Sequence, residues 1–234
     1  LYQQWGLPGG PPDPWRWLDV CPPSLQVGKV DWETLPMTFP PFNGSMVLPS
    51  WLAEPRTSDS RSASRRIGVT LGNIPIMGSH ADVLDTVLAA VDGFDAEVVV
   101  GMSRALPEVD KLPRNVRLVP CLPLSELLPS CDLLISHGGA GSVLTAMTFG
   151  LPQVVLPQTC VHFQHGDRLA EVGAAVSLHP GDATAGAIRD ALTGLLENPD
   201  AGRAAAALRD ENARQPSLGS VVEKIETSLG VAGT

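Results

Sequence analysis

From residue 67 onward, short apolar runs alternate with longer stretches in which apolar residues recur at helical spacing. The apolar runs predict buried strands at residues 67–71, 97–100, 116–119, 133–135, 154–156 and 174–178. The helical spacing predicts helices at residues 81–91, 124–128, 142–149, 167–172, 184–197, 200–214 and 217–229. Six short strands that alternate with helices predict an α/β fold, a doubly wound parallel sheet with right-handed crossovers.

The carboxyl ends of the predicted strands are the expected place for a functional site, because doubly wound sheets bind their ligands outside these ends. Four segments follow predicted strands and would share this edge: residues 72–73, 119–122, 137–142 and 157–163. The chemistry of these four segments therefore decides the functional prediction.

The segment His-Gly-Gly-Ala-Gly-Ser at residues 137–142 joins the predicted central strand to the helix after it. Its three glycines let the backbone turn sharply and approach a ligand that any Cβ would keep away. Ser142 is expected to begin the helix, and Gly150 followed by Pro152 to end it. The first N–H groups of a helix have no partner inside it, and the positive end of the helix dipole points at the turn. Such a turn predicts an anion site, most often for a phosphate.

The first 53 residues differ from the rest of the chain. All five tryptophans and ten of the 22 prolines lie in the first 51 residues, and prolines at this density exclude long helices and central strands. So many aromatic side chains need a surface to pack on. Either the segment lies on the chain's own domain, or it belongs to a neighbouring domain outside this sequence. Residues 54–66, rich in serine and arginine, predict a solvated linker.

Composition restricts the expected partners. A net charge of −9 and a pI near 4.9 argue against a nucleic-acid surface, which needs a basic patch. An anionic ligand would therefore be held by local amides and dipoles. No apolar run approaches the length of a membrane span, and the four cysteines show no Cys-x-x-Cys spacing. We therefore expect a cytoplasmic protein with reduced thiols and no membrane span.

The glycine turn and its surroundings resemble a known motif. His137 before the glycines, the helix, and Leu-Pro-Gln-Val-Val-Leu-Pro-Gln at 151–158 closely resemble the donor-binding motif of two-domain (GT-B) glycosyltransferases of the family-1 type. Within that group the chain is similar to bacterial enzymes that attach deoxysugars to macrolide and polyketide aglycones. The resemblance implies a Rossmann-like donor domain that holds the diphosphate of a nucleotide sugar through His137, Gly139, Ala140, Gly141 and Ser142.

Two other segments resemble this family with departures. Gly72 and Asn73 stand where the family has Gly-Thr or Gly-Ser approaching the diphosphate, so the contact of Asn73 differs. Cys121 and Leu122 stand where an aromatic residue and a valine hold the nucleotide base. Cys121 lacks a stacking ring, worth about 1 kcal/mol beyond its buried area, whereas the main chain of Leu122 can still hydrogen-bond the base edge.

The sugar-binding positions depart furthest. Val161 and His162 stand where the family usually has Asp-Gln, whose side chains hold sugar hydroxyls. Val161 cannot make the one or two charge-assisted hydrogen bonds that an aspartate would make to the sugar. The binding of a deoxysugar would depend least on these bonds, and His162 can still bond one hydroxyl. The alternative is that this site has decayed. His162 and His165 are also spaced as metal ligands, but the lack of an accompanying carboxylate or cysteine favours a pair of surface histidines.

The resemblance implies the donor-binding half of an inverting, metal-independent glycosyltransferase of the hexosyltransferase type. The donor would be a nucleoside diphosphate sugar, with dTDP the expected nucleotide, and the acceptor a hydrophobic polyketide-like aglycone. No further cofactor is implied. His137 would stabilise the leaving diphosphate in the transition state, while the general base would lie in a missing N-terminal acceptor domain.

The same resemblance divides the chain. Residues 1–53 correspond to the end of the acceptor domain and the crossover, 54–66 to the linker, 67–216 to the donor-binding domain, and 217–234 to a C-terminal helix. Two alternatives remain open at the level of sequence. One is a non-catalytic nucleotide-sugar-binding subunit that needs a separate acceptor-binding partner, and the other is a degenerate structural module.

Overall fold

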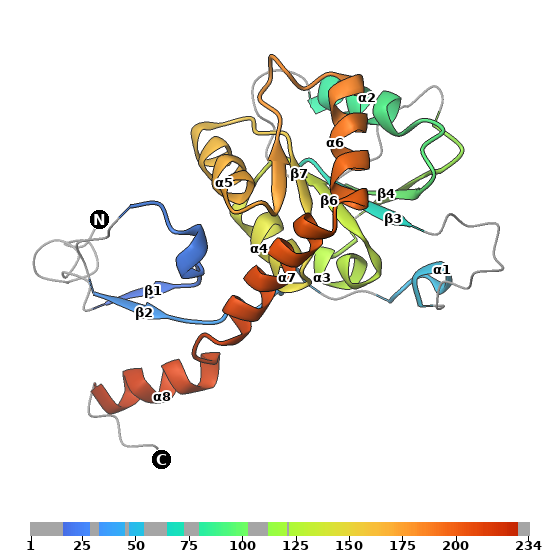
Figure 1. Cartoon of the computed structure of the whole chain (residues 1–234). Helices are drawn as coiled ribbons and strands as arrows, with labels where there is room; N and C mark the ends of the chain where they lie inside the picture. The colour runs from blue at the N-terminus through green and yellow to red at the C-terminus, as the bar shows by residue number, and fades with distance from the viewer. Residues whose placement is uncertain are drawn as a thin grey trace, which may run out of the picture.

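A parallel sheet of six strands lies at the centre of the chain, with helices on both of its faces (Figure 1). The fold is that of a computed structural model, which describes residues 16–28, 33–44, 47–53, 65–72, 80–102, 112–120 and 122–228. The predicted doubly wound α/β fold is confirmed.

The strands lie in the order β5-β4-β3-β6-β7-β8, and each neighbouring pair is parallel. Their bounds are β3 Arg66–Thr70, β4 Glu97–Met102, β5 Val116–Pro120, β6 Leu133–Ser136, β7 Gln153–Val155 and β8 Ala175–Ser177. Counted from the first strand of this sheet, the order is 3-2-1-4-5-6, which is the order of dinucleotide-binding folds. The sheet is extended first to one side of β3 and then to the other, so its switch point lies between β3 and β6.

The helices of the domain pack in two layers. α2 and α6 cover one face of the sheet, α3, α4 and α5 lie on the other, and α7 packs on α4. The bounds are α2 His80–Val91, α3 Leu124–Leu127, η3 Leu128–Ser130, α4 Ala140–Thr148, α5 Cys160–Glu171, α6 Ala185–Glu197, α7 Pro199–Ala213 and α8 Leu218–Ser228. The predicted break between the sixth and seventh helices is confirmed, because the Asn198 side chain accepts from the Asp200 N–H (2.9 Å) as the N-cap of α7.

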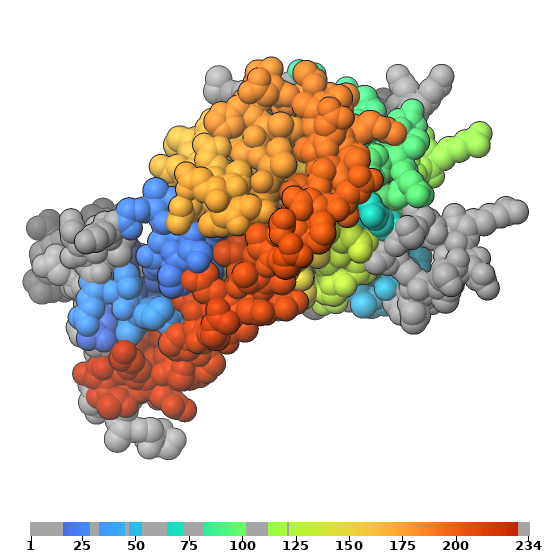
Figure 2. Space-filling view, in the orientation of Figure 1, coloured from blue at the N-terminus to red at the C-terminus, as the bar shows by residue number. Residues whose placement is uncertain are grey.

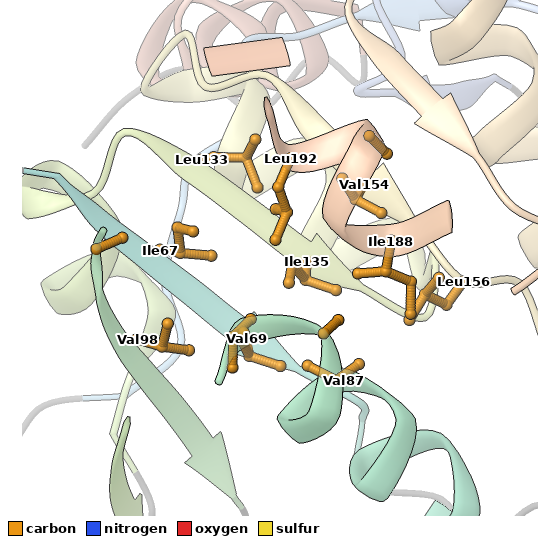
Figure 3. Close-up of a cluster of buried hydrophobic side chains, with 14 of the residues drawn as sticks. Ile67, Val69, Val87, Val98, Leu133, Ile135, Val154, Leu156, Ile188 and Leu192 are labelled. Carbon is orange, nitrogen blue, oxygen red and sulfur yellow. The ribbon is translucent and has the colours of Figure 1, made fainter. Parts of the chain in front are cut away.

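Alternate residues of the central strands enter two separate cores. Leu133 and Ile135 of β6 pack with side chains of α2 and α6, as Figure 3 shows. Leu134 packs on the other face, with side chains of α3, η3 and α4. All three are fully buried, which explains why this strand is a continuous apolar run and not an alternating one.

Two helix starts differ from the prediction. α4 begins at Ala140 and not at Ser142, because Gly139 takes the extended N-cap conformation and its carbonyl accepts from the Val143 N–H (3.0 Å). α5 begins at Cys160, about two turns before the predicted start at residue 167, with extended Thr159 as its N-cap. Residues 160–163, expected in the segment that follows the predicted strand at 154–156, therefore form the first turn of a helix.

Arg66, the last residue of the predicted linker, is instead the first residue of β3 and is buried. Its guanidinium pairs with Glu97 (2.8 Å) and donates to Ser130 Oγ (2.7 Å). Its backbone N–H donates to Asp132 Oδ2 (2.7 Å). A buried guanidinium needs such partners, so this arginine belongs to the sheet and not to a solvated segment. Residues 54–64 lie outside the described residues.

The described residues between 17 and 39 lie against α7 and α8 (Figure 2), whereas residues 50–53 pack beside α3 on the other side of the domain. They form β1 (Trp17–Asp19), η2 (Pro23–Leu25), β2 (Thr34–Pro36) and α1 (Ser50–Ala53), with β1 and β2 paired in parallel. Leu35 is buried beside Val221 of α8, and the Thr38 N–H donates to the Pro216 carbonyl (2.9 Å). Of the two expected arrangements, these residues show packing on the chain's own domain. None of the described helices is both long enough and apolar enough to cross a membrane.

Candidate functional site

The switch point of the sheet brings two predicted site segments together. β3 and β6 are neighbours, with Thr70 opposite Ser136 in the register, so the chain leaves both strands at the same edge. Gly72 lies two residues after β3 and His137 directly after β6, and the two residues are close to each other. A Cβ added to Gly72 would lie 2.8 Å from Cε1 of the His137 ring. This edge is where the fold places a ligand crevice.

The turn after β6 is held in a conformation that requires glycine. Gly138 has a φ of +86°, and a Cβ there would lie 2.9 Å from Val155 Cγ1 and 3.0 Å from the His162 carbonyl oxygen. Side chains hold both of its polar groups. Its N–H donates to Ser136 Oγ (3.2 Å), and its carbonyl lies 2.7 Å from His165 Nδ1. The turn is therefore fixed from the sheet on one side and from α5 on the other.

The His137 ring fills a slot that only glycines leave open. In addition to the close approach to Gly72, a Cβ at Gly139 would lie 2.5 Å from His137 Nε2. The ring also meets the His162 ring edge-to-face, with centroids 4.6 Å apart and planes at 85°. Any side chain at these glycines would displace the imidazole, so its position depends on both.

The N-terminus of α4 presents backbone donors beside this histidine. The first helical bond runs from the Val143 N–H to Gly139, so the amides of Ala140, Gly141 and Ser142 precede it. Within the described part of the chain, none of these three amides donates a hydrogen bond. Ala140 and Gly141 are exposed. Free amides at the positive end of a helix dipole, next to an imidazole, are the kind of donors that bind anions in proteins.

The first turn of α5 carries the two predicted sugar-binding residues. Val161 is 50% exposed, whereas His162 is half-buried against His137. Burial, followed by the positive charge of His165, lowers the pKa of His162 below its ordinary 6.5. The ring is therefore neutral at neutral pH and available as a hydrogen-bonding group.

Of the two predicted base-binding residues, only Leu122 is among the described residues. The Leu122 side chain is buried in the core beside Val119 and Leu127, so only its main chain can serve a ligand. Asn73 and Cys121, the other predicted contacts, lie outside the described residues.

Ser136 and His165 hold the glycine turn, and sequence reasoning assigned neither of them this role. His162 and His165, expected as a pair of surface histidines, are both half-buried, and each contacts the turn. Their spacing of three residues places them on one helix face, a signal that the misplaced start of α5 concealed. In the described residues, no group of three or more His, Cys, Asp or Glu side chains is arranged to hold a metal ion.

Comparisons with known proteins identify the family of the chain. The chain is 34% identical over 210 residues to an erythronolide mycarosyltransferase of Saccharopolyspora erythraea, covering 89% of this chain and 48% of that protein. It is 37% identical over 214 residues to an L-demethylnoviosyl transferase of Streptomyces niveus, covering 90% and 54%. Among solved structures, the glycosyltransferase VinC in complex with dTDP superposes with a TM-score of 0.77 at 32% identity, covering 92% of this chain and 52% of VinC.

The chain thus spans about half the length of the curated relatives it matches. Its homologues are glycosyltransferases that transfer deoxysugars to macrolide and polyketide aglycones, and its structural neighbours have the GT-B fold. Residues 85–228 match the sequence model of a family described as erythromycin biosynthesis protein CIII-like, C-terminal domain. The chain belongs to this family.

Proposed function

We propose that the chain is the donor-binding half of an inverting glycosyltransferase, which uses a dTDP-deoxysugar and a polyketide-like acceptor. The observation that carries the proposal is the convergence of His137 with the free amides of Ala140, Gly141 and Ser142 at the switch point. The complex of VinC with dTDP supports the choice of nucleotide. The names of the relatives support a sugar transfer.

In the proposed reaction, an acceptor hydroxyl attacks the anomeric carbon while the bond from that carbon to the β-phosphate oxygen breaks. The hydroxyl proton passes to a general base, and dTDP leaves with the electron pair. A single displacement inverts the configuration. Negative charge grows on the β-phosphate as the bond breaks, and donors fixed in place beforehand stabilise this charge most effectively. His137 and the α4 amides would fill this role for the leaving group.

We propose that the sugar site favours donor sugars that carry few hydroxyl groups. The exposed side chain of Val161 is apolar and offers no hydrogen bond. His162 offers one neutral imidazole. A deoxysugar fits this pair better than a fully hydroxylated hexose, which would leave hydroxyl groups without partners.

We propose that neither a metal ion nor a cofactor is needed besides the nucleotide sugar. Helix amides and an imidazole can neutralise a diphosphate in place of a divalent cation. This assignment predicts that the affinity for dTDP is the same with Mg²⁺ as with EDTA.

The proposed partner is an acceptor-binding domain that supplies the general base and the aglycone cleft. Apolar side chains of the N-terminal segment support it, because Trp17 is 47% exposed, Leu18 56% and Phe42 79%. Exposed apolar groups gathered in one segment are typical of interaction surfaces. Residues 1–234 by themselves are then expected to bind dTDP without transferring sugar.

Calorimetric titration with dTDP tests the donor site. Replacing His137 by alanine should weaken binding by about 1.5–3 kcal/mol, the range for a hydrogen bond to a charged group. His179→Ala is the matched control, since that exposed imidazole pairs with Asp167 (2.8 Å) and meets the ring of Phe163, outside the glycine turn. Equal affinity of a folded His137→Ala protein and the wild type would exclude the proposed role of His137.

A further inference from the structure

The peptide groups on either side of Gly138 are held by side chains from two separate elements. Ser136 Oγ of β6, fully buried, accepts from the Gly138 N–H at 3.2 Å. On the other side, His165 Nδ1 of α5 lies 2.7 Å from the Gly138 carbonyl oxygen. Gly138 is itself buried, at a φ of +86°. A buried carbonyl needs a donor, and His165 is the donor that the fold provides.

The geometry fixes where a proton sits on His165. A carbonyl oxygen can only accept, so the Nδ1 atom at 2.7 Å must carry the hydrogen. The neutral ring is therefore in the Nδ1–H tautomer, and protonation at Nε2 leaves this bond in place. A side chain of similar size without a donor at this point would lose the bond, whereas an asparagine amide nitrogen can occupy the position of Nδ1.

Gly138 lies between the two parts of the proposed anion site. The residue before it is His137, and the residue after it is Gly139, the N-cap of α4. Rotation of the peptide after Gly138 would change the direction of the α4 amides and the slot in which the His137 ring lies. Conformations with positive φ are adopted by glycine with ease, and glycine is also free to leave them. A hydrogen bond from another element to this peptide therefore helps to keep the α4 amides and His137 in their orientation.

We infer that His165 is a positioning residue of the donor site, which fixes the Gly138 peptide through Nδ1–H and thereby aims His137 and the α4 amides at the diphosphate. This inference rests on the proposed function. It assigns to α5 a second task besides presenting Val161 and His162, because the same helix face holds the turn that binds the leaving group.

The test compares His165→Leu, which has no donor, with His165→Asn, which keeps one. Calorimetry with dTDP should show a loss on the order of tenfold or more for the leucine variant, since one hydrogen bond no longer orders the site. The asparagine variant should stay within about threefold of the wild type. Thymidine, which lacks the diphosphate, should bind all three proteins equally. A change in thymidine affinity parallel to that of dTDP would indicate general damage and overturn the inference.

A second measurement needs no variant. Long-range ¹H–¹⁵N correlation of the histidine rings should show that Nδ1 of His165 carries a hydrogen. The Nε2–H tautomer, a leucine variant that binds dTDP as well as the wild type, or an asparagine variant as weak as leucine would each overturn the inference. The wild-type titration alone decides the proposed function, so its failure is distinguishable from a failure of the role of His165.

Discussion

Replacing Gly141 with alanine separates the stability of the chain from its capacity to bind a diphosphate. Gly141 is the second residue of α4, and a Cβ built on it meets no atom within 4 Å. Its φ lies outside the positive range that glycine alone favours. The free protein should therefore accept alanine without strain. A diphosphate that approaches the backbone at this point should be kept away by the new methyl group.

The two effects have opposite signs and different sizes. Alanine in place of glycine stabilises a helix by roughly 0.5–1 kcal/mol in its interior, with less expected in the first turn. For a domain of this size, 1 kcal/mol shifts the Tm by about 2–4 °C, so a rise of about 1–4 °C is the upper expectation. Loss of one amide bond to a phosphate oxygen costs about 1.5–3 kcal/mol, which weakens the affinity for dTDP about 10- to 150-fold.

The assay pairs thermal unfolding with calorimetric titration of dTDP. Gly194→Ala in α6 is the matched control, because a Cβ there also meets nothing within 4 Å. It should raise the Tm and leave dTDP binding unchanged. If Gly141→Ala keeps the wild-type affinity for dTDP, the ligand does not approach this backbone, and the reasoning from glycine to phosphate fails.

Three further predictions follow from the same geometry. Gly139→Ala should displace the His137 ring, since the new Cβ would lie 2.5 Å from Nε2; in a double-mutant cycle of dTDP affinity, Gly139→Ala and His137→Ala should then be strongly non-additive, and simple additivity would contradict the contact. The folded-state pKa of His162 is lowered, first by burial and then by the charge of His165, so its contribution to stability is present above the unfolded value of 6.5 and is lost as the pH falls through the lower folded value. Urea unfolding at about pH 7 and about pH 5 should therefore show a smaller acid loss for His162→Gln than for the wild type, and equal losses would refute this cause. Calorimetry in EDTA should give the same dTDP affinity as in Mg²⁺, and a large loss on chelation would overturn the metal-independent site.

The strands of this fold could be predicted closely because each is a short apolar run buried on the sheet. Leu133 and Ile135 enter one core and Leu134 the other, so periodicity and burial agree. The order of the strands was not predictable from such runs, since pairing depends on contacts distant in sequence.

The ends of the helices were predicted less evenly than the strands. The predicted end of α4 is confirmed, because Gly150 adopts a φ of +67° and its N–H donates to the Met147 carbonyl (2.9 Å), as in a glycine C-cap. The starts of α4 and α5 were misplaced. Gly139 has no side chain with which to cap α4, whereas Thr159 is a favoured N-cap residue type whose side chain makes no cap bond in the structure.

The candidate site was predictable as far as its local motif extends. Residues 137–142 are contiguous, so their joint role follows from order and residue type. The contact of His165 with Gly138 spans 27 residues, and that of Gly72 with His137 joins two strands. Such contacts depend on the packing of α5 and on the strand order, which no local pattern contains.

Whether the glycine turn binds the diphosphate of the donor is decided by a crystal structure with dTDP. We expect the β-phosphate at the N-terminus of α4, within hydrogen-bonding distance of the Gly141 and Ser142 amides and of His137. A nucleotide bound elsewhere on the sheet edge, for example in the cavity of about 200 Å³ lined by Asp82 and Gln158, with the turn free of phosphate, would contradict it.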